Sequence, residues 1–119
     1  MTLRLTPDLL AAAYDYLRQT PPFKSKKLPE SDDLEFRVTR HKDRFGHYDD
    51  RDGKKPWKNI AISEVHVKTG TALLEVLAHE MVHVTLHVSG VKDWGDHGGS
   101  FKRLAARVCS AHGFDLKTF

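Results

Sequence analysis

Two histidines and a glutamate stand at a spacing that could bind and use a metal ion. They occur in the pentapeptide His79-Glu80-Met81-Val82-His83, which has the pattern H-E-x-x-H. Residues four apart lie on one face of a helix, so the imidazoles of His79 and His83 can reach one ion. Glu80 is rotated by about 100° from His79, so its carboxylate can take a proton from an attacking water without being a ligand. On a helix, this pattern is typical of zinc peptidases.

The pentapeptide lies in a strongly apolar segment. Residues 73–84 place hydrophobic side chains around most of a helical wheel, which predicts a largely buried helix. Burying two imidazoles and a carboxylate costs several kcal/mol unless these groups are paired or bind a metal. The alternative is an amphipathic helix with two unrelated histidines and a solvated glutamate, and the buried context favours the metal site.

A catalytic zinc site usually takes three protein ligands, so a third is needed beyond the two histidines. No glutamate follows Glu80, and the compact H-E-x-x-H-x-x-G-x-x-H pattern is not completed. His87 lies two helical turns from His79, too far for both to bind one ion, and is expected near the helix end or beside the site. Besides His87, the downstream candidates are Asp93, Asp96, His97, His112 and Asp115.

Among these candidates, His97 is placed best. It follows a loop long enough to fold back, and it precedes Gly98-Gly99, where the backbone can approach the site closely. Asp93 and Asp96 remain as alternative ligands or as partners of a histidine ring. His112 is expected to interact with the carboxyl end of the last helix.

Three other histidines have no ligand-like spacing. They are His41, His47 and His66, which fall in or beside predicted strands. We interpret them as surface or packing residues.

Hydrophobic periodicity predicts three helices and three strands. Helices are expected between Thr6 and Pro21, over about 72–88 and over 100–112, with end signals at Thr69-Gly70-Thr71, Ser89-Gly90 and Gly113. Strands are expected over 34–40, 44–48 and 57–63, with a turn over 49–53. The pentapeptide would then lie on the central helix, and His97 in the loop before the last one.

Length and composition fit one small domain. The chain has 119 residues and one cysteine, Cys109, so a single domain over residues 1–119 can bury a core without disulfides. A lone cysteine fits a reducing compartment. The N-terminus lacks the apolar core of a signal peptide and no apolar run spans a membrane, so we expect a cytoplasmic protein. The formal net charge of +3 permits an anionic partner but does not demand one.

The two-part histidine motif resembles that of the SprT-like metallopeptidases. His79-Glu80-Met81-Val82-His83 is followed by His97-Gly98-Gly99-Ser100-Phe101-Lys102, similar to that family's H-E-x-x-H and later H-G-x-x-F. The strand pieces over 44–48 and 60–63 are similar too, so the resemblance covers roughly residues 34–112. It implies a small α+β, zincin-like fold, in which a small antiparallel or mixed sheet packs on an active-site helix beside N- and C-terminal helices.

The resemblance also implies a chemistry. One zinc ion would be held by His79, His83 and His97, with Glu80 as the catalytic acid and base of a zinc-dependent endopeptidase. Well-studied relatives cleave proteins crosslinked to DNA and are switched on by DNA, and many carry a cysteine zinc ribbon that this chain lacks. Any DNA contact would therefore come from the core domain. Short stand-alone members occur in bacteria and their phages, and this chain could be one of them. If it is encoded by a phage, the expected location is the cytoplasm of the host.

The mechanism expected from these residues is a metal-assisted hydrolysis. A peptide substrate would pair with an edge strand in the region 40–57. Glu80 would take the proton from water and pass it to the leaving amine. Tyr48 and His47 are candidates for stabilising the oxyanion, although either could be a packing residue, and Asp96 could hold a histidine ring.

Two other classes of function compete with the peptidase. One is a nucleic-acid-binding module with structural zinc, which would use basic and aromatic residues around the predicted strands: Arg37, Arg40, Lys42, Arg44, Lys54, Lys55, Trp57 and Lys58. The other is a catalytically inert zincin-like binding protein, and the presence of Glu80 counts against it. The expected partners are a protein or peptide substrate and, more weakly, DNA, with no membrane contact and a monomeric state.

Overall fold

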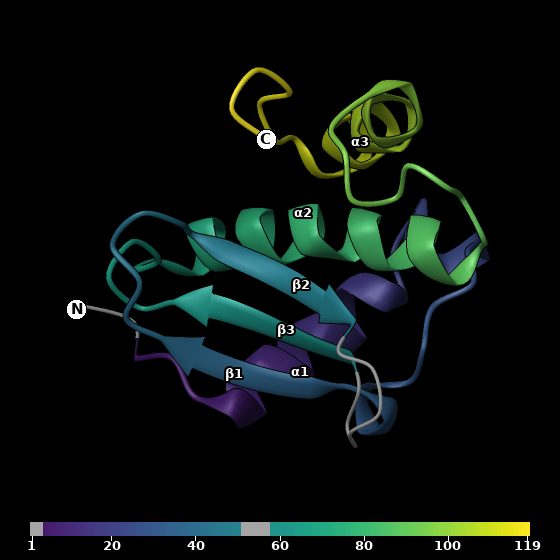
Figure 1. The fold of residues 1–119 in the computed structure, drawn as a ribbon. Helices are drawn as coiled ribbons and strands as arrows, with labels where there is room; N and C mark the ends of the chain where they lie inside the picture. The colour runs from purple at the N-terminus through teal and green to yellow at the C-terminus, as the bar shows by residue number, and fades with distance from the viewer. Residues whose placement is uncertain (1–3, 51–57) are drawn as a thin grey trace.

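The fold combines helices with a small sheet. The computed structural model describes residues 4–50 and 58–119. They form the helices α1 (Pro7–Arg18), α2 (Gly70–Val88) and α3 (Gly99–His112), the strands β1 (Glu35–Thr39), β2 (Gly46–Asp50) and β3 (Lys58–Ser63), and two 3-10 turns, Phe23–Ser25 and Ser31–Asp33 (Figure 1). The expected α+β class is confirmed.

The sheet is mixed, and its centre is β3. The strand order is β1-β3-β2, with β1 parallel and β2 antiparallel to β3. The turn predicted over 49–53 is wrong at its start, because Asp49 and Asp50 pair with Asn59 and Lys58 as part of β2. The rest of that turn lies outside the described residues. β2 therefore forms one edge of the described sheet.

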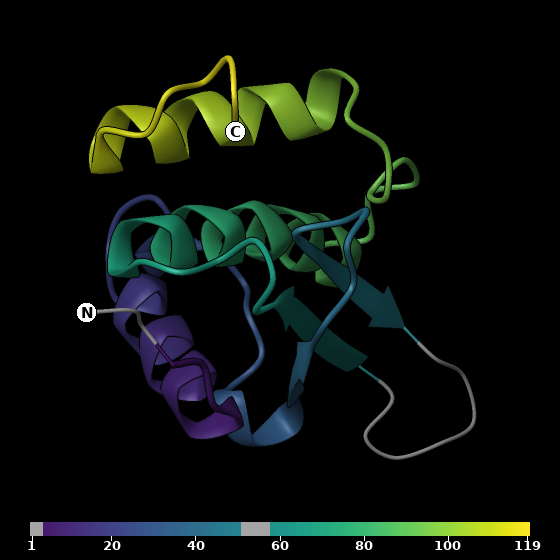
Figure 2. The same cartoon turned by 90° about the vertical axis from the view of Figure 1, so that its left-hand side faces the viewer.

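Helix α2 lies between two layers. The sheet and α1 lie on one side of it and α3 lies on the other (Figures 1 and 2). Contact on both sides explains why apolar residues surround most of this helix. The side chains that are almost fully buried come from each layer: Leu10, Tyr14 and Leu17 of α1, Ile60 and Ile62 of β3, Leu77, Met81, Val82 and Val84 of α2, and Val108 of α3.

The ends of α2 have clear local causes. The Thr69 hydroxyl accepts a hydrogen bond from the backbone N–H of Ala72 at 3.1 Å, which caps the first turn. At the other end, Ser89 follows the last turn, and Gly90 has a positive φ of 80° that ends the helix. Both predicted end signals are confirmed. None of the helices in the described ranges is long and apolar enough to cross a membrane.

Candidate metal centre

Helix α2 presents three polar side chains from its middle turns. His79 and His83 lie one turn apart, and their ring centroids are separated by 5.2 Å. His83 is 7% exposed and Glu80 is 5% exposed, whereas His79 is half-buried. The burial of Glu80 and His83 is unusual for side chains of their type.

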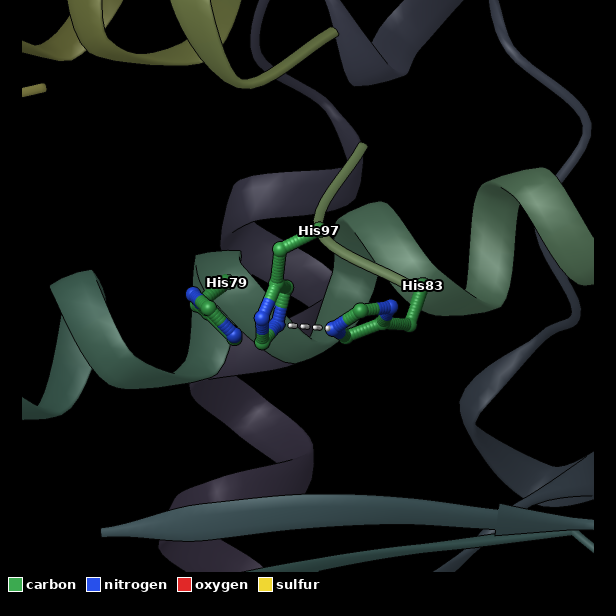
Figure 3. Close-up of side chains that lie close together, drawn as sticks. All are labelled: His79, His83 and His97. Carbon is green, nitrogen blue, oxygen red and sulfur yellow. Dashed lines mark hydrogen bonds between the residues drawn. The ribbon is translucent and has the colours of Figure 1, made fainter. Parts of the chain in front are cut away.

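His97 joins this pair from the loop before α3. Its ring centroid lies 5.1 Å from that of His79 and 5.0 Å from that of His83. The Nε2 atoms of His83 and His97 are 3.1 Å apart, and the three rings point toward one another (Figure 3). One ligand atom from each ring lies within 4.8 Å of the others. We call His79, His83 and His97 the histidine trio.

Backbone carbonyls orient two rings of the trio. The Nδ1 of His83 lies 2.8 Å from the carbonyl oxygen of Trp94, and the Nδ1 of His79 lies 3.1 Å from that of Phe119. Each Nδ1–H can donate to its carbonyl, which leaves the Nε2 lone pair for another partner. Metal-binding histidines commonly have this arrangement, with the second ring nitrogen held by a carbonyl or carboxylate.

A phenylalanine ring packs against the whole trio. The centroid of Phe101, in the first turn of α3, lies 4.9, 4.8 and 4.7 Å from those of His79, His83 and His97. Burial lowers the pKa of His79 to about 4, assisted by the neighbouring His83 and His97, and burial also lowers the pKa of His83. Both rings are therefore neutral at neutral pH, the form that binds a metal.

Glu80 is buried beside the trio, and its carboxylate has no partner among the described residues. Within residues 4–50 and 58–119, no side chain or backbone group forms a hydrogen bond or ion pair with its carboxylate. Burial raises its pKa to about 8, and the positive charge of Arg44 opposes this shift. An unpaired buried carboxylate destabilises a fold, so its position calls for a role other than packing.

A cavity of about 670 Å³ opens beside Glu80. We call it the Glu80 cavity; it is lined by Phe45, Gly46, Thr69, Thr71, Ala72, Glu75, Val76, His79, Glu80, Thr118 and Phe119. Gly46 allows β2 to approach α2 at this point, because a Cβ atom there would lie 2.9 Å from the Ala61 carbonyl oxygen and 3.1 Å from the Val76 side chain. Gly98 and Gly99, where we expected a close approach, have no such contact with the trio.

The donor set of the trio fits a zinc ion. Two Zn–N bonds of about 2.0–2.1 Å in tetrahedral geometry place their nitrogens about 3.3–3.4 Å apart. The 3.1 Å between the Nε2 atoms of His83 and His97 is close to that value, and one ring nitrogen of His79 lies within 4.8 Å of a ligand atom of each of these residues. In the described part of the chain, no other histidine, cysteine or carboxylate belongs to this group. Three protein ligands with an open fourth position are typical of catalytic zinc.

Comparison with models of known protein families assigns the chain to a family. A sequence model of the SprT-like family matches residues 13–118, nearly the whole chain. The chain belongs to the SprT-like family. No curated protein and no solved structure shows significant similarity to it. The match extends beyond the region over 34–112 that carried the resemblance in the sequence, and the observed α+β architecture agrees with the zincin-like fold expected of this family.

Three other side chains expected near the site of this SprT-like chain have the following positions. The Tyr48 hydroxyl contacts Nδ1 of His87 at 2.8 Å, one turn beyond His83 on α2. His47 pairs with Ala61 and lies on the sheet face opposite to Tyr48. Asp96 is exposed in the loop, and its backbone N–H donates to the Asp93 carbonyl at 3.0 Å. These positions give no support to an oxyanion role for Tyr48 or His47 or to a contact between Asp96 and the trio.

Two of the remaining metal-ligand candidates have contacts of their own. Nε2 of His112 lies 3.0 Å from the Thr20 hydroxyl, at the last residue of α3. The Asp115 carboxylate accepts a hydrogen bond from the backbone N–H of Lys117 at 3.0 Å. Neither belongs to the trio.

Two of the basic residues expected to contact nucleic acid, Arg37 and Arg44, line a hollow at the sheet. Arg37, Thr39, His41, Arg44, His47, Tyr48 and Asp49 line a hollow of about 480 Å³, which we call the sheet-face hollow. Exposed Arg40 forms an ion pair with Glu64 at 3.2 Å. Lys42 is exposed and Lys58 is half-buried, whereas Lys54, Lys55 and Trp57 lie outside the described residues.

Sequence reasoning missed the groups that orient the trio. The carbonyls of Trp94 and Phe119 are backbone groups. Every residue has such a group, so residue type does not predict which carbonyls contact the trio. Phe101 was part of the H-G-x-x-F motif in the sequence, but its packing against the three histidine rings was not predicted. The segment 114–119 is too short for its pattern to predict a structure, although it reaches the site.

Proposed function

We propose that this chain is a zinc-dependent endopeptidase. The observation that supports this most strongly is the convergence of three imidazoles beside Glu80, a buried carboxylate that has no partner in the described structure and lines a cavity. Membership in the SprT-like family supports a peptidase-like domain. A structural zinc site would normally have four protein ligands, and a structural site has no use for Glu80.

The roles of the side chains follow from their positions. His79, His83 and His97 would hold one Zn²⁺, which would polarise the scissile carbonyl and acidify the attacking water when bound. A divalent cation beside Glu80 favours the ionised carboxylate and so lowers its pKa from about 8. Glu80 then accepts the proton of the attacking water and donates it to the leaving amine.

The substrate would lie along β2. This strand forms an edge of the described sheet next to α2, and its first residue, Gly46, lines the Glu80 cavity. An extended peptide paired with this edge would pass the cavity and could place one side chain in it. Loosely folded proteins and peptides are the substrate class that can adopt this extended form.

The first test replaces Glu80 with glutamine. Glu80→Gln should bind zinc at the wild-type ratio and lower kcat by about 100-fold to 10⁴-fold, because only the proton transfer is lost. The assay follows self-cleavage and cleavage of a loosely folded protein by zinc-loaded enzyme. Glu64→Gln, at the exposed ion pair with Arg40, is the matched control and should cleave normally. Cleavage by Glu80→Gln at the wild-type rate would rule out the assigned role.

A second candidate function is nucleic-acid binding at the sheet-face hollow. It is favoured by the cationic side chains of Arg37 and Arg44 at the border of this hollow. Bound DNA could present associated proteins to the site, so this function and the peptidase are compatible. Salt-dependent binding of single-stranded DNA tests it, and the absence of binding at low salt would exclude it.

A further inference from the structure

We propose that residues 114–119, which we call the return segment, position a ligand of the metal centre and shape the cavity beside it. Its Phe119 carbonyl positions His79 for metal binding, and its Thr118 and Phe119 form a wall of the Glu80 cavity. This inference rests on the proposed function, since it assigns residues to the same site. It concerns a positioning role, because the segment acts through His79.

The return segment is folded back by local hydrogen bonds. Gly113 ends α3 with a positive φ of 79°, and its N–H donates to the Cys109 carbonyl at 2.8 Å. Asp115 then makes a turn: its carboxylate accepts from the N–H of Lys117, and its carbonyl accepts from the N–H and hydroxyl of Thr118 at 3.1 and 3.3 Å. The chain therefore runs back beside α3 (Figure 2).

Aromatic packing holds the end of the segment against the site. The ring centroid of Phe119 lies 6.0 Å from that of Phe114, 6.2 Å from that of Phe101 and 5.4 Å from that of His79. The Phe119 ring is stacked on the ring of Phe114 and on the ring of Phe101. Phe119 thus packs against Phe101, which also packs against the histidine trio.

The Phe119 carbonyl does for His79 what the Trp94 carbonyl does for His83. Both accept from a Nδ1–H, at 3.1 Å and 2.8 Å. A neutral imidazole can carry its proton on either nitrogen, and the carbonyl favours the form with Nε2 free for a metal. Without Phe119, His79 would populate both tautomers and more ring orientations, so the loss should weaken zinc binding by about 10-fold to 100-fold.

The same segment restricts the Glu80 cavity. Thr118 and Phe119 line it together with Phe45 and Gly46 at the start of β2. A substrate side chain in this cavity would contact the Phe119 ring, so the segment should also influence which side chains are accepted. Removing the ring widens the cavity and should relax that preference.

Four variants separate these roles. Deleting Thr118 and Phe119 removes the carbonyl and the ring, whereas Phe119→Ala keeps the carbonyl and removes the ring. Asp115→Ala weakens the turn without altering the site's own groups. Leu116→Ala is the matched control, because this side chain is 52% exposed in the same segment and does not line the cavity.

The readouts do not depend on activity alone. Zinc affinity is measured by competition with a chelator, and the tautomer of His79 in the metal-free protein is measured by ¹⁵N NMR. We expect the deletion to weaken zinc binding by about 10-fold to 100-fold and to reduce the Nδ1-protonated form, with a smaller loss for Asp115→Ala. Phe119→Ala should accept a wider range of side chains in a peptide-library cleavage profile, and Leu116→Ala should match wild type.

The outcomes distinguish this inference from the proposed function. A wild-type chain that binds zinc and cleaves, with an unchanged zinc affinity and His79 tautomer in the deletion, would overturn the inference alone. An equal loss of zinc affinity in Leu116→Ala would also overturn the inference, because the effect would then not depend on the groups that contact the site. A wild-type chain that binds no zinc would overturn both.

Discussion

Two groups of histidines in this protein differ in how their rings are held. In the histidine trio, His79 and His83 each face a backbone carbonyl through Nδ1, and Nε2 is directed to the other rings. In the sheet-face hollow, the rings of His41 and His47 are 6.3 Å apart. Nδ1 of His47 is buried there with no hydrogen-bond partner among the described residues.

The electrostatic surroundings differ as well. Burial lowers the pKa of both His79 and His47, but only His47 has arginines among the causes, chiefly Arg44. Arginine side chains that disfavour a protonated imidazole would also repel a divalent cation. Close histidines are therefore insufficient for a metal centre. The trio is distinguished by the orientation of two rings by carbonyls, and by the lack of any arginine among the causes of the His79 and His83 pKa shifts in the described part of the chain.

The largest expected difference between the groups is in zinc affinity. His83→Ala removes a proposed ligand and should weaken zinc binding by more than about 100-fold, beyond the loss expected for an outer partner. His47→Ala should change it by no more than about twofold, as for a substitution away from the site. Chelator competition on the two purified variants measures both. Equal losses of zinc affinity in the two variants would contradict the distinction between the histidine trio and the histidines of the sheet-face hollow.

A smaller effect is expected in the pH dependence of stability without metal. The pKa of His79 in the folded chain is about 4, below its ordinary value of 6.5. Between these values the unfolded chain binds a proton that the folded chain does not, so stability falls as pH is lowered through this window. The loss attributable to His79 is up to about 3 kcal/mol.

Urea unfolding of the metal-free protein at pH 7, 5.5 and 4.5 measures this loss, and His79→Gln should reduce it. Added zinc should oppose unfolding at pH 7, where His79 and His83 are neutral, and should lose this effect as these two rings become protonated. An identical pH profile in His79→Gln and wild type would show that this ring is not buried as described.

The smallest expected effect concerns the sheet-face hollow. If Arg37 contacts a phosphate, Arg37→Glu should weaken single-stranded DNA binding and reduce the magnitude of its salt slope by about 1. Zinc affinity should stay at the wild-type value, because Arg37 lies outside the trio. Fluorescence anisotropy over a salt series measures the slope, and an unchanged slope would remove Arg37 from the interface.

The sequence predicted the parts of this protein that depend on side-chain type and spacing. The apolar pattern around His79 and His83 identified α2, and Thr69 and Gly90 marked its ends. The loop position of His97, with the family resemblance, selected a residue that the structure brings to 3.1 Å from His83. The α+β class and the SprT-like family were both recognised correctly.

The unpredicted parts depend on backbone groups and on distant segments that meet only in the fold. Carbonyl acceptors such as those of Trp94 and Phe119 can come from any residue type, so predicting their positions requires the path of the chain. The glycine that allows a close approach is Gly46, and this is clear only once β2 lies against Val76 of α2. Asp49 was expected in a turn because of its residue type, but pairing with Asn59 keeps it in β2.

The most direct test of the account is X-ray absorption at the zinc edge on protein loaded with one equivalent of zinc. We predict three imidazole nitrogens and one further light atom at about 2.0–2.1 Å, with His97→Ala losing one imidazole and His47→Ala losing none. A spectrum with fewer than three imidazoles, or one unchanged in His97→Ala, would contradict the assignment of the histidine trio as a catalytic zinc centre.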